Sequence, residues 1–332
     1  MITIKEIAKA AGVSPSTVSN ALNGKPNVSE KVRERIFALC EEMNYQPNPA
    51  SKGLKSGKSK TLLFVFSDFD RQFYLQIIKG INQYTNLRGY DLLVCSAKTC
   101  SKFMHPSITC GSIILDRRVQ DQLILQKASK DYPIISLDRP LKHQGAKSIL
   151  LDNYSVMSEL IEGLYLRGYR KFAFLAGVES TLDNQERYAA MSDVLRSHGL
   201  KIAPEHHLHG DYTEQSGYQA AKILLLSKQL PEIVISANDD MAFGMIEAFR
   251  ESGLRIPQDI AVTGFDDEKP AEALGLTTIS VPNFERGYLA TQHLINCIIG
   301  EGDFAPVTIN ARVAWRNGTV LKQLGSHSPK DQ

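Results

Sequence analysis

Residues 2–24 read ITIKEIAKAAGVSPSTVSNALNG, and this stretch decides the architecture at the start of the chain. One face of a first helix carries the apolar residues Ile4, Ile7, Ala8 and Ala11. Thr3 is the expected N-cap and Gly12 the expected end of that helix. Ser14 is a second N-cap, and Pro15 fits the first turn of the helix that follows. A third helix is expected to start at Ser29.

The second predicted helix turns a polar surface outward. Val18, Ala21 and Leu22 form its apolar stripe, while its other face carries Ser16, Thr17, Ser19 and Asn20. A helix, a glycine-containing turn and a short polar-faced helix are typical of the helix-turn-helix, whose second helix enters the DNA major groove. A generic three-helix bundle would show the same spacing. Geometry alone therefore leaves both interpretations open.

Charge is distributed unevenly along the chain. Residues 1–60 carry ten Lys and Arg against five Glu and no Asp, a balance of +5, whereas the remaining 272 residues carry 28 basic and 31 acidic residues. A small basic part beside a large, slightly acidic part indicates a polyanion-binding module joined to a separate sensing or catalytic body. Residues 48–57, NPASKGLKSG, join the two as a basic linker or as a helix of about two turns, too short to be stable alone in water.

From Thr61 onward short apolar runs alternate with longer amphipathic stretches. The predicted strands are Leu62–Phe66, Asp91–Cys95, Gly111–Leu115, Pro133–Leu137, Ser148–Leu151, Lys171–Ala176, Ile233–Ser236, Ile260–Thr263 and Thr277–Val281. The predicted helices between them include Phe73–Arg88, Tyr154–Arg167, Gln185–His198, Glu214–Leu226 and Met241–Glu251. This alternation predicts parallel sheets built from βαβ units, and the length fits two such sheets.

Candidate ligand-binding residues follow several of the predicted strands, where open parallel sheets bind ligands. They are Asp68 and Phe73 after the first strand, Asp138, the pair Asn238-Asp239 and the pair Asp266-Asp267. Carboxylates and an amide in one cleft suit a ligand rich in hydroxyl groups, although paired carboxylates are also used in glycoside hydrolysis. His206, His207 and His209 lie close together, and we interpret them as a solvated loop rather than a metal site.

Other site classes lack their sequence signals. No glycine-rich loop has dinucleotide or phosphate-loop spacing, so we expect no cofactor, and no catalytic triad or metal motif is present. The five cysteines are an odd number without metal-ligand spacing, which favours reduced thiols. The chain has no apolar run near the ~18 residues of a membrane span and no secretory start. We therefore expect a cytoplasmic protein.

The N-terminal stretch, continued by VSEKVRERI and MNYQPNPASKGLKSGKS, strongly resembles the DNA-binding part of the lactose/galactose repressor (LacI/GalR) family. The resemblance implies DNA contacts by Thr3, Ser14, Pro15, Ser16, Thr17, Ser19, Asn20, Asn48, Ala50, Ser51, Lys52, Leu54 and Lys55. Thr17 and Ser19 would bond phosphates, while Pro15, Ser16 and Asn20 would face base edges. Many members of the family carry Arg in place of Asn20, and Asn prefers adenine where Arg prefers guanine. Leu54 would wedge into the minor groove from a hinge helix.

The body resembles the effector-binding core of the same family in runs such as FSDFDRQFYLQIIKGI, GVESTLDNQERYAA and LTTISVPNFERG. The implied fold is α/β, a helix-turn-helix head plus a periplasmic-binding-protein-like core of two doubly wound parallel-sheet subdomains joined by three crossovers. The implied boundaries are 1–46 for the DNA-binding domain, 47–59 for the hinge, 60–325 for the core and 326–332 for the tail. Within the core, the N-subdomain spans about 60–151 and 282–310, and the C-subdomain about 152–281 and 311–325.

The resemblance also implies an effector site. Arg187, Asn238 and Asp266 would clamp the effector, Tyr212 would stack on it, and Asp68, Phe73 and Asp138 would face it from the other subdomain. Arg71-Gln72, where Asn-Pro is frequent, and Ala190, where Gly is frequent, are departures from the family pattern.

The sequence thus predicts a transcriptional regulator rather than an enzyme. It would be a repressor that binds a pseudo-palindromic operator as a homodimer. The tail GSHSPKDQ has no leucine heptad of the kind that joins dimers into tetramers in some members of the family. A small-molecule effector, taken to be a sugar or sugar derivative, would control its DNA affinity. The alternatives are a phosphoprotein or nucleobase co-regulator on the same scaffold, a cytosolic carbohydrate-processing enzyme, and a solute receptor of a transporter.

Overall fold

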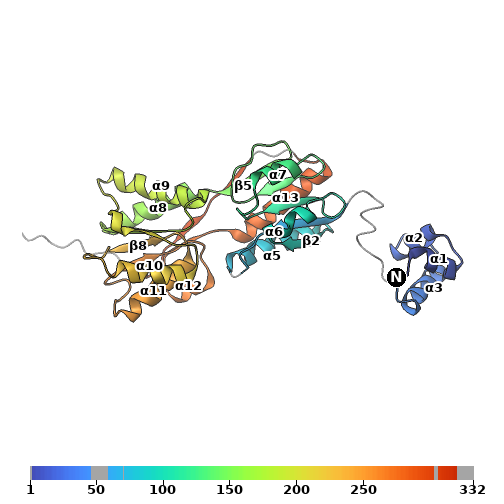
Figure 1. The fold of residues 1–332 in the computed structure, drawn as a ribbon, viewed down its shortest axis with the longest axis horizontal. Helices are drawn as coiled ribbons and strands as arrows, with labels where there is room; N and C mark the ends of the chain where they lie inside the picture. The colour runs from blue at the N-terminus through green and yellow to red at the C-terminus, as the bar shows by residue number, and fades with distance from the viewer. Residues whose placement is uncertain (1, 46–58, 70, 303–305, 320–332) are drawn as a thin grey trace, which may run out of the picture. The chain divides into compact units, whose positions relative to one another are not determined.

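The computed structural model describes residues 2–45, 59–69, 71–302 and 306–319. The chain divides into two compact units, one ending at Ser59 and the other beginning at Lys60. We call them the head and the body, and each is described by itself (Figure 1).

The described residues of the head form three helices, α1 (Ile4–Ala11), α2 (Pro15–Leu22) and α3 (Glu30–Glu42). The carboxylate of Glu6 accepts the backbone N–H of Thr3 at 2.8 Å, which completes a capping box at the start of α1. Gly12 ends α1 in the left-handed conformation, at a φ of 63°. The Ser14 hydroxyl accepts the backbone N–H of Thr17 at 3.1 Å and so caps α2. The sequence placed these helix starts correctly because each has its own cap.

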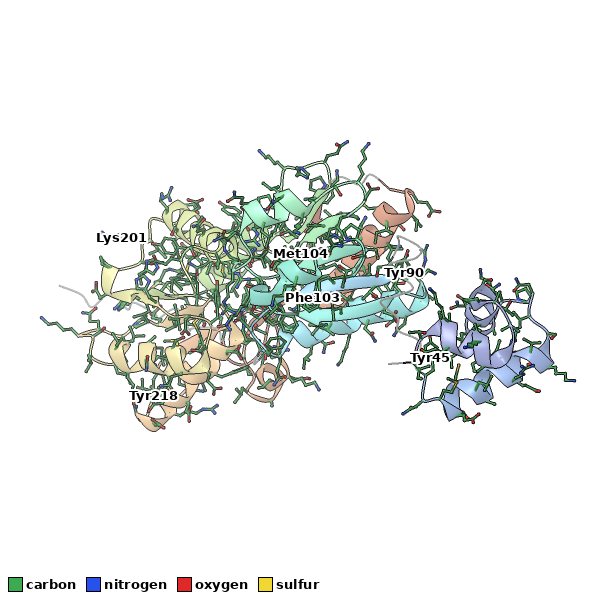
Figure 2. The ribbon with its side chains drawn as sticks, turned by 45° about the vertical axis from the view of Figure 1, so that its right-hand side comes forward. Tyr45, Tyr90, Phe103, Met104, Lys201 and Tyr218 are labelled. Carbon is green, nitrogen blue, oxygen red and sulfur yellow. The ribbon has the colours of Figure 1, made fainter. Side chains whose placement is uncertain are left out.

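One small apolar core holds the head together. All three helices contribute buried side chains to it: Ile7, Ala8, Ala11, Val18, Ala21, Val28, Ile36 and Cys40. Tyr45, which follows α3, packs against the same cluster (Figure 2). Every short helix therefore depends on the other two, since a helix of eight residues is marginal alone.

The first sheet of the body has six parallel strands in the order β11-β5-β4-β3-β1-β2. Its strands are β1 (Thr61–Val65), β2 (Asp91–Cys95), β3 (Gly111–Ile114), β4 (Ile134–Ser136), β5 (Ala146–Leu151) and β11 (Val307–Ile309). The helices of this N-subdomain are α5 (Phe73–Leu87), α6 (Ala97–Phe103), α7 (Asp121–Lys127) and α13 (Asn283–Ile299). Two glycines let α5 and α13 approach closely, because a Cβ at Gly80 would lie 2.0 Å from the Phe284 carbonyl oxygen and one at Gly287 2.2 Å from that of Ile77.

The second sheet has four parallel strands in the order β7-β6-β8-β9. Its strands are β6 (Phe172–Ala176), β7 (His207–His209), β8 (Ile233–Ser236) and β9 (Ala261–Thr263), with β10 (Thr278–Ser280) and β12 (Arg312–Ala314) as a separate antiparallel pair. The helices of this C-subdomain are α8 (Asn153–Leu166), α9 (Leu182–Ser197), α10 (Glu214–Leu224), α11 (Asp239–Glu251) and α12 (Lys269–Ala273), with a 3-10 turn at Pro204–His206. Figure 1 shows α8 and α9 on one face of the sheet and α10 and α11 on the other.

The chain passes between the two subdomains three times. The crossings follow β5, follow β10 and lie between β11 and β12. The predicted fold class, two doubly wound parallel-sheet subdomains behind a helical N-terminal unit, is confirmed. Because each subdomain is built from separate chain segments, the carboxyl ends of both sheets can contribute to one site.

The structure corrects two details of the predicted strands. His207–His209 form the edge strand β7, so the predicted solvated loop at these histidines is wrong. Strands β11 and β12 were not predicted, because each has only three residues and mixes polar with apolar side chains. In the part of the chain that the structure describes, no helix has the length and apolar character that a membrane span requires.

Candidate functional site

Six of the predicted DNA-contacting residues lie along one exposed side of α2 and its cap, and a seventh, Thr3, caps α1. Thr3, Ser14, Pro15 and Ser16 are exposed, and Thr17, Ser19 and Asn20 are half-buried. Val18 and Ala21 on the opposite side of α2 are fully buried in the head core. The helix therefore has one apolar and one hydroxyl-rich face, as an element that docks on a polar partner requires.

Local hydrogen bonds order this polar face. The Ser14 hydroxyl lies 2.6 Å from that of Ser16 and 2.9 Å from that of Thr17, and Asn23 donates to the Ser19 carbonyl at 2.6 Å. Among the described residues, none bonds the carboxamide of Asn20. Asn20 thus keeps both donors and acceptors for a base edge. The other six predicted contacts, Asn48, Ala50, Ser51, Lys52, Leu54 and Lys55, lie outside the described residues.

In the body, polar side chains from both subdomains meet near the carboxyl ends of the strands. We call this region the cleft and define it by Arg71, Asp138, Arg187, Tyr212, Asp266 and Arg286. Arg187 is held firmly on the C-subdomain side and is only 6% exposed. Its Nε donates to Asn153 Oδ1 at 2.9 Å, its Nη1 donates to the Ala237 carbonyl at 2.5 Å, and its guanidinium lies 3.4 Å from the ring centre of Phe265.

Asp266 follows β9 in a strained conformation. Its φ of 108° is rare for a residue with a side chain, and strain of this kind concentrates at binding sites. Burial raises the pKa of its carboxyl to about 6, against the lowering effect of Arg71 and Arg187. A carboxyl in this state can accept or donate a hydrogen bond near neutral pH.

Tyr212 and Asn238 form a unit at the ends of β7 and β8. Asn238 caps α11 by accepting the Met241 N–H at 3.2 Å, and its amide donates to the Tyr212 carbonyl at 3.1 Å. Tyr212 has a φ of 71°, and its hydroxyl lies 3.0 Å from that of Thr181. Its ring covers Gly177, where a Cβ would come within 2.1 Å of ring atoms. The structure thus uses Asn238 to hold the tyrosine in place, and its contact with an effector stays a prediction.

Arg71 reaches across from the N-subdomain. Its Nη2 lies 3.5 Å from Asp266 Oδ2 and its Nε 3.6 Å from Asp240 Oδ2, distances that suit ion pairs but not hydrogen bonds. The guanidinium lies 4.5 Å from the ring centre of Phe73 and 5.1 Å from that of Tyr212. Sequence reasoning identified Arg71 only as a departure from the family pattern. Its loose ion pairs link the two subdomains.

The remaining predicted residues belong to the N-subdomain. The Phe73 backbone N–H donates across the cleft to Glu268 at 3.2 Å, and burial raises the pKa of Glu268 to about 7. Asp138 is buried after β4, accepts the Ser136 hydroxyl at 2.9 Å and has a raised pKa, because burial disfavours its charge. The Asp68 side chain does not join this group through any contact among the described residues, although the Asp68 backbone carbonyl accepts the Arg71 N–H at 3.4 Å. It pairs at 2.7 Å with Arg118, and both side chains are well exposed.

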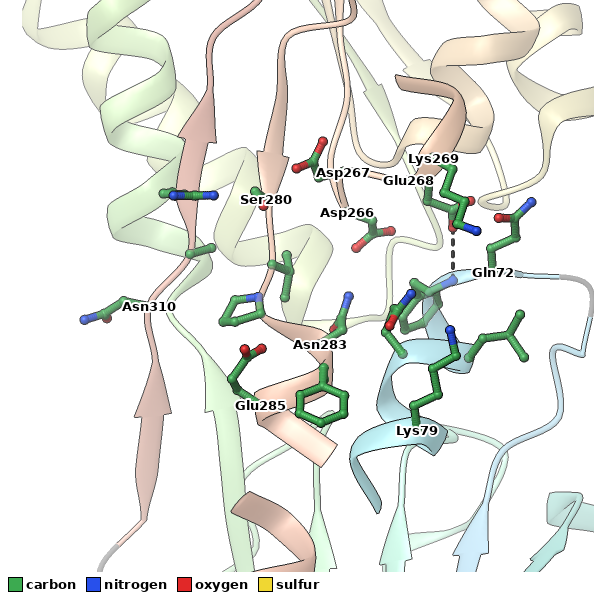
Figure 3. Close-up of a pocket in the computed structure, with 18 residues that line it drawn as sticks. Gln72, Lys79, Asp266, Asp267, Glu268, Lys269, Ser280, Asn283, Glu285 and Asn310 are labelled. Atoms are coloured by element: carbon green, nitrogen blue, oxygen red, sulfur yellow. Dashed lines mark hydrogen bonds between the residues drawn. The ribbon is translucent and has the colours of Figure 1, made fainter. Parts of the chain in front are cut away.

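A cavity of about 640 Å³ opens between the subdomains beside these residues (Figure 3). It is bounded by the start of α5, by residues 266–269 and by the crossing segments at 280–285 and 310–312. Phe73 and Asp266 line it, whereas the other five predicted effector residues do not. Figure 3 also shows Asn283, Glu268 and Lys79 around the opening. A hydroxyl-rich small molecule would fit a space of this size.

Sequence reasoning missed Arg286, Asn283 and Asn153. All three are buried at the cleft, and all lie just after a point where the chain crosses between subdomains. Their position after a crossing is the sequence signal that would have identified these residues. A helix that starts where the chain crosses between subdomains directs its first turn toward the other subdomain.

A polar-faced three-helix unit followed by a two-subdomain α/β core with a polar cleft defines the class of ligand-responsive DNA-binding regulators. Residues 3–48 match the family model described as bacterial regulatory proteins, lacI family, and residues 161–319 match the periplasmic binding protein-like domain. The probable HTH-type transcriptional repressor ExuR of Bacillus subtilis is 32% identical over 90% of this chain and 92% of its own length. The chain belongs to the lacI family of bacterial regulatory proteins.

Two further comparisons agree. The HTH-type transcriptional regulator KdgR of Bacillus subtilis is 29% identical over 95% of this chain and 96% of its own. A solved structure of the lac repressor dimer bound to operator and the anti-inducer ONPF superposes with a TM-score of 0.80, at 26% identity over 96% of this chain and 99% of that one. These relatives are transcriptional regulators, and this chain is a helix-turn-helix transcriptional regulator of the same family.

Proposed function

We propose that this regulator is a cytoplasmic repressor that binds a pseudo-palindromic operator as a homodimer, and that a carbohydrate-type effector bound in the cleft controls its operator affinity. The lac repressor of the solved structure is a dimer bound to operator and to a small anti-inducer. The observation that carries the proposal is the pair of long contacts from Arg71 of the N-subdomain to Asp240 and Asp266 of the C-subdomain.

These contacts couple ligand binding to subdomain geometry. Because neither ion pair reaches hydrogen-bond distance, a ligand with better-placed groups can replace both and change how the subdomains are held. If the effector changes operator affinity by some factor, the operator must change effector affinity by the same factor. The proposed DNA contacts are those on α2, with Asn20 and Ser16 at base edges and Thr17 and Ser19 at phosphates.

The test is operator binding by the full chain. After an operator is selected from random duplexes, fluorescence anisotropy should give an affinity that falls steeply with salt, by about 0.9 in log K per log salt for each phosphate neutralised. Six or more neutralised phosphates would lower the affinity by about 10³-fold or more between 50 and 200 mM salt. The exposed Lys201 of the body provides a control, and Lys201→Gln should leave the slope unchanged. A salt slope near zero would contradict DNA binding.

The same assay tests effector control. A compound that stabilises the protein in a thermal-shift screen should change operator affinity by about 5-fold or more, the range of ordinary allosteric coupling, and leave binding to random DNA unchanged. A compound that binds the cleft tightly and leaves operator affinity the same would contradict the proposed regulation.

A further inference from the structure

Arg286 is a buried cation that forms no ion pair with the described residues. It lies in the first turn of α13 and is only 5% exposed. Its Nη2 donates to the Leu137 carbonyl. Among the described residues, its Nε has no hydrogen-bond partner and no carboxylate forms an ion pair with it. Burial lowers the pKa of its guanidinium. A buried charge is unfavourable by several kcal/mol unless a partner compensates it, so this arginine calls for one.

The charges around Arg286 belong to both subdomains. Asp183, Asp138 and Asp266 act on it as negative charges, and Arg187 opposes them. Asp138 comes from the N-subdomain, whereas Asp183, Asp266 and Arg187 come from the C-subdomain. The guanidinium therefore lies at the cleft, between the clamp residues and the end of β4.

Two hydrogen-bond acceptors near Arg286 also lack partners in the part of the chain that the structure describes. Oδ2 of Asp138 and Oδ1 of Asn283 are buried and have no hydrogen-bond partner among the described residues. Asn283 and Asp138 are 5% and 6% exposed, and Asn283 lines the cavity (Figure 3). Native proteins leave few buried polar groups unmatched, and each one needs an explanation. Here the charged donor of Arg286 and the acceptors of Asp138 and Asn283 all lack hydrogen-bond partners from the described chain on the N-subdomain side of the cleft.

We infer that the effector is a polyhydroxy carboxylic acid, whose carboxylate pairs with Arg286 and whose hydroxyls donate to Asp138 and Asn283. A planar guanidinium matches a carboxylate best, and hydroxyl groups supply the donors that the two acceptors lack. A neutral sugar would leave Arg286 without a counter-charge, and an anion without hydroxyls would face Asp138 with nothing to donate. This inference rests on the proposed function, because it specifies the ligand class of the same cleft.

A purely structural role for Arg286 makes a different prediction. As a tie between α13 and β4 it needs only its bond to Leu137, which a neutral amide could also make. Arg286→Gln therefore removes the charge and keeps an amide donor on a shorter side chain. Arg286→Lys is the matched control that keeps the charge.

The experiment measures binding to the full chain by calorimetry at neutral pH with matched ligand pairs. The pairs are galacturonate with galactose, glucuronate with glucose, and gluconate with glucitol, each differing in the carboxylate. At least one acid should bind about 10–150-fold more tightly than its neutral counterpart, the range of a charged hydrogen bond. In Arg286→Gln this ratio should fall to near one, and in Arg286→Lys a preference for the acid should remain. The ratio within each variant does not depend on the stability of that variant.

Several results would overturn the inference. Equal or tighter binding of the neutral sugars would exclude the acid class, as would failure of every acid to bind. An Arg286→Gln protein that keeps the full preference would remove Arg286 from the site. Operator binding, measured in the same preparation without ligand, reports on the proposed regulator by itself. If the preference for the acid is absent and operator binding is intact, the inference about the effector is wrong and the proposed DNA-binding function is unaffected.

Discussion

The polar face of α2 and the cleft of the body differ in how their polar groups are satisfied. On α2 the hydroxyls are exposed or half-buried, bond one another locally and can keep water as a partner, as Ser14, Ser16 and Thr17 do. In the cleft, buried atoms of Asp138, Asn283 and Arg286 have no partner among the described residues. An exposed polar face can meet many partners at small cost, whereas buried unmatched groups require one particular ligand. Substitutions in the cleft should therefore have larger effects than substitutions on α2.

The largest expected effect follows from breaking the clamp. Arg187→Ala and Asp266→Asn should each weaken effector binding by about 2–5 kcal/mol, because each leaves charged or polar partners unpaired in a buried site. Operator binding without effector should persist, since both residues lie in the body. Calorimetry with a ligand found by thermal shift measures the loss, and anisotropy measures the operator affinity.

Stability must be followed in the same variants. Arg187 bonds Asn153 and Ala237 and stacks on Phe265, so its removal also lowers the melting temperature of the C-subdomain. Asp266→Asn keeps the shape of the side chain and avoids this problem. Asp259→Asn is the matched control, because Asp259 pairs with Arg255 on the surface and belongs to no cleft contact. Effector affinity like that of the wild type in a folded Asp266→Asn protein would remove Asp266 from the site.

A second prediction concerns pH. Burial raises the pKa of Asp266 from its usual range to about 6. Between about pH 4 and 6, the Asp266 carboxyl is therefore protonated in the folded protein and ionised in the unfolded chain. Since the folded state binds more protons there, the free energy of unfolding decreases as pH rises through this window. The Asp266 contribution amounts to about 3 kcal/mol, and Glu268, whose pKa is raised to about 7, acts in the same direction up to that pH.

Urea unfolding of the ligand-free protein from pH 4.5 to 7.5 measures this effect. The stability of the wild type relative to Asp266→Asn should decrease with rising pH up to about pH 6 and then level off. On the exposed face of α2 no comparable pH dependence is expected, because its candidate residues do not titrate in this range. If the difference in unfolding free energy between the two proteins stays constant with pH, the Asp266 carboxyl is ionised throughout this range. The cleft would then show no more pH dependence than α2.

Sequence and structure agree most closely where local signals act. Ser14, Pro15 and Gly12 define the ends of the head helices through capping chemistry that involves only neighbouring residues. Strand Ile233–Ser236 was predicted with its observed ends, because a continuous apolar run suits a sheet covered on both faces. Strand Asp91–Cys95 was also predicted with its observed ends, although it is a partly exposed edge strand. Short edge strands such as β7 lack this signal. Their pairing depends on a partner strand that is distant in the sequence.

The cleft was predicted in outline and missed in part for the same reason. Strand ends indicated Asp138 and Asp266, and the family motif indicated Arg187. Arg71 and Arg286 lie in a loop and in a helix first turn, where an arginine is ordinarily an exposed surface residue. Only the folded chain shows that Arg71 crosses between subdomains and that Arg286 is buried without a carboxylate. No sequence pattern encodes the absence of a partner.

The smallest expected effect belongs to α2. Asn20 is half-buried at the second turn of the helix, and no described residue bonds its carboxamide, so we expect it to read one base pair in each half-site. Asn pairs best with adenine and Arg with guanine. Asn20→Arg should therefore change the preferred base at one position by about 1–3 kcal/mol of discrimination. Affinity for random DNA should change little, because the proposed phosphate contacts of Thr17 and Ser19 remain.

Selection from randomised operators with both proteins measures this shift, and Asn23→Ala serves as a control because Asn23 bonds back to Ser19 at the end of α2. Asn23→Ala should weaken binding to all sequences alike, since it loosens the helix without changing a base contact. The same consensus from wild type and Asn20→Arg would show that Asn20 does not face a base. A consensus changed at several adjacent positions would show that the whole helix had moved, and that the exposed face of α2 is as sensitive to single substitutions as the buried cleft.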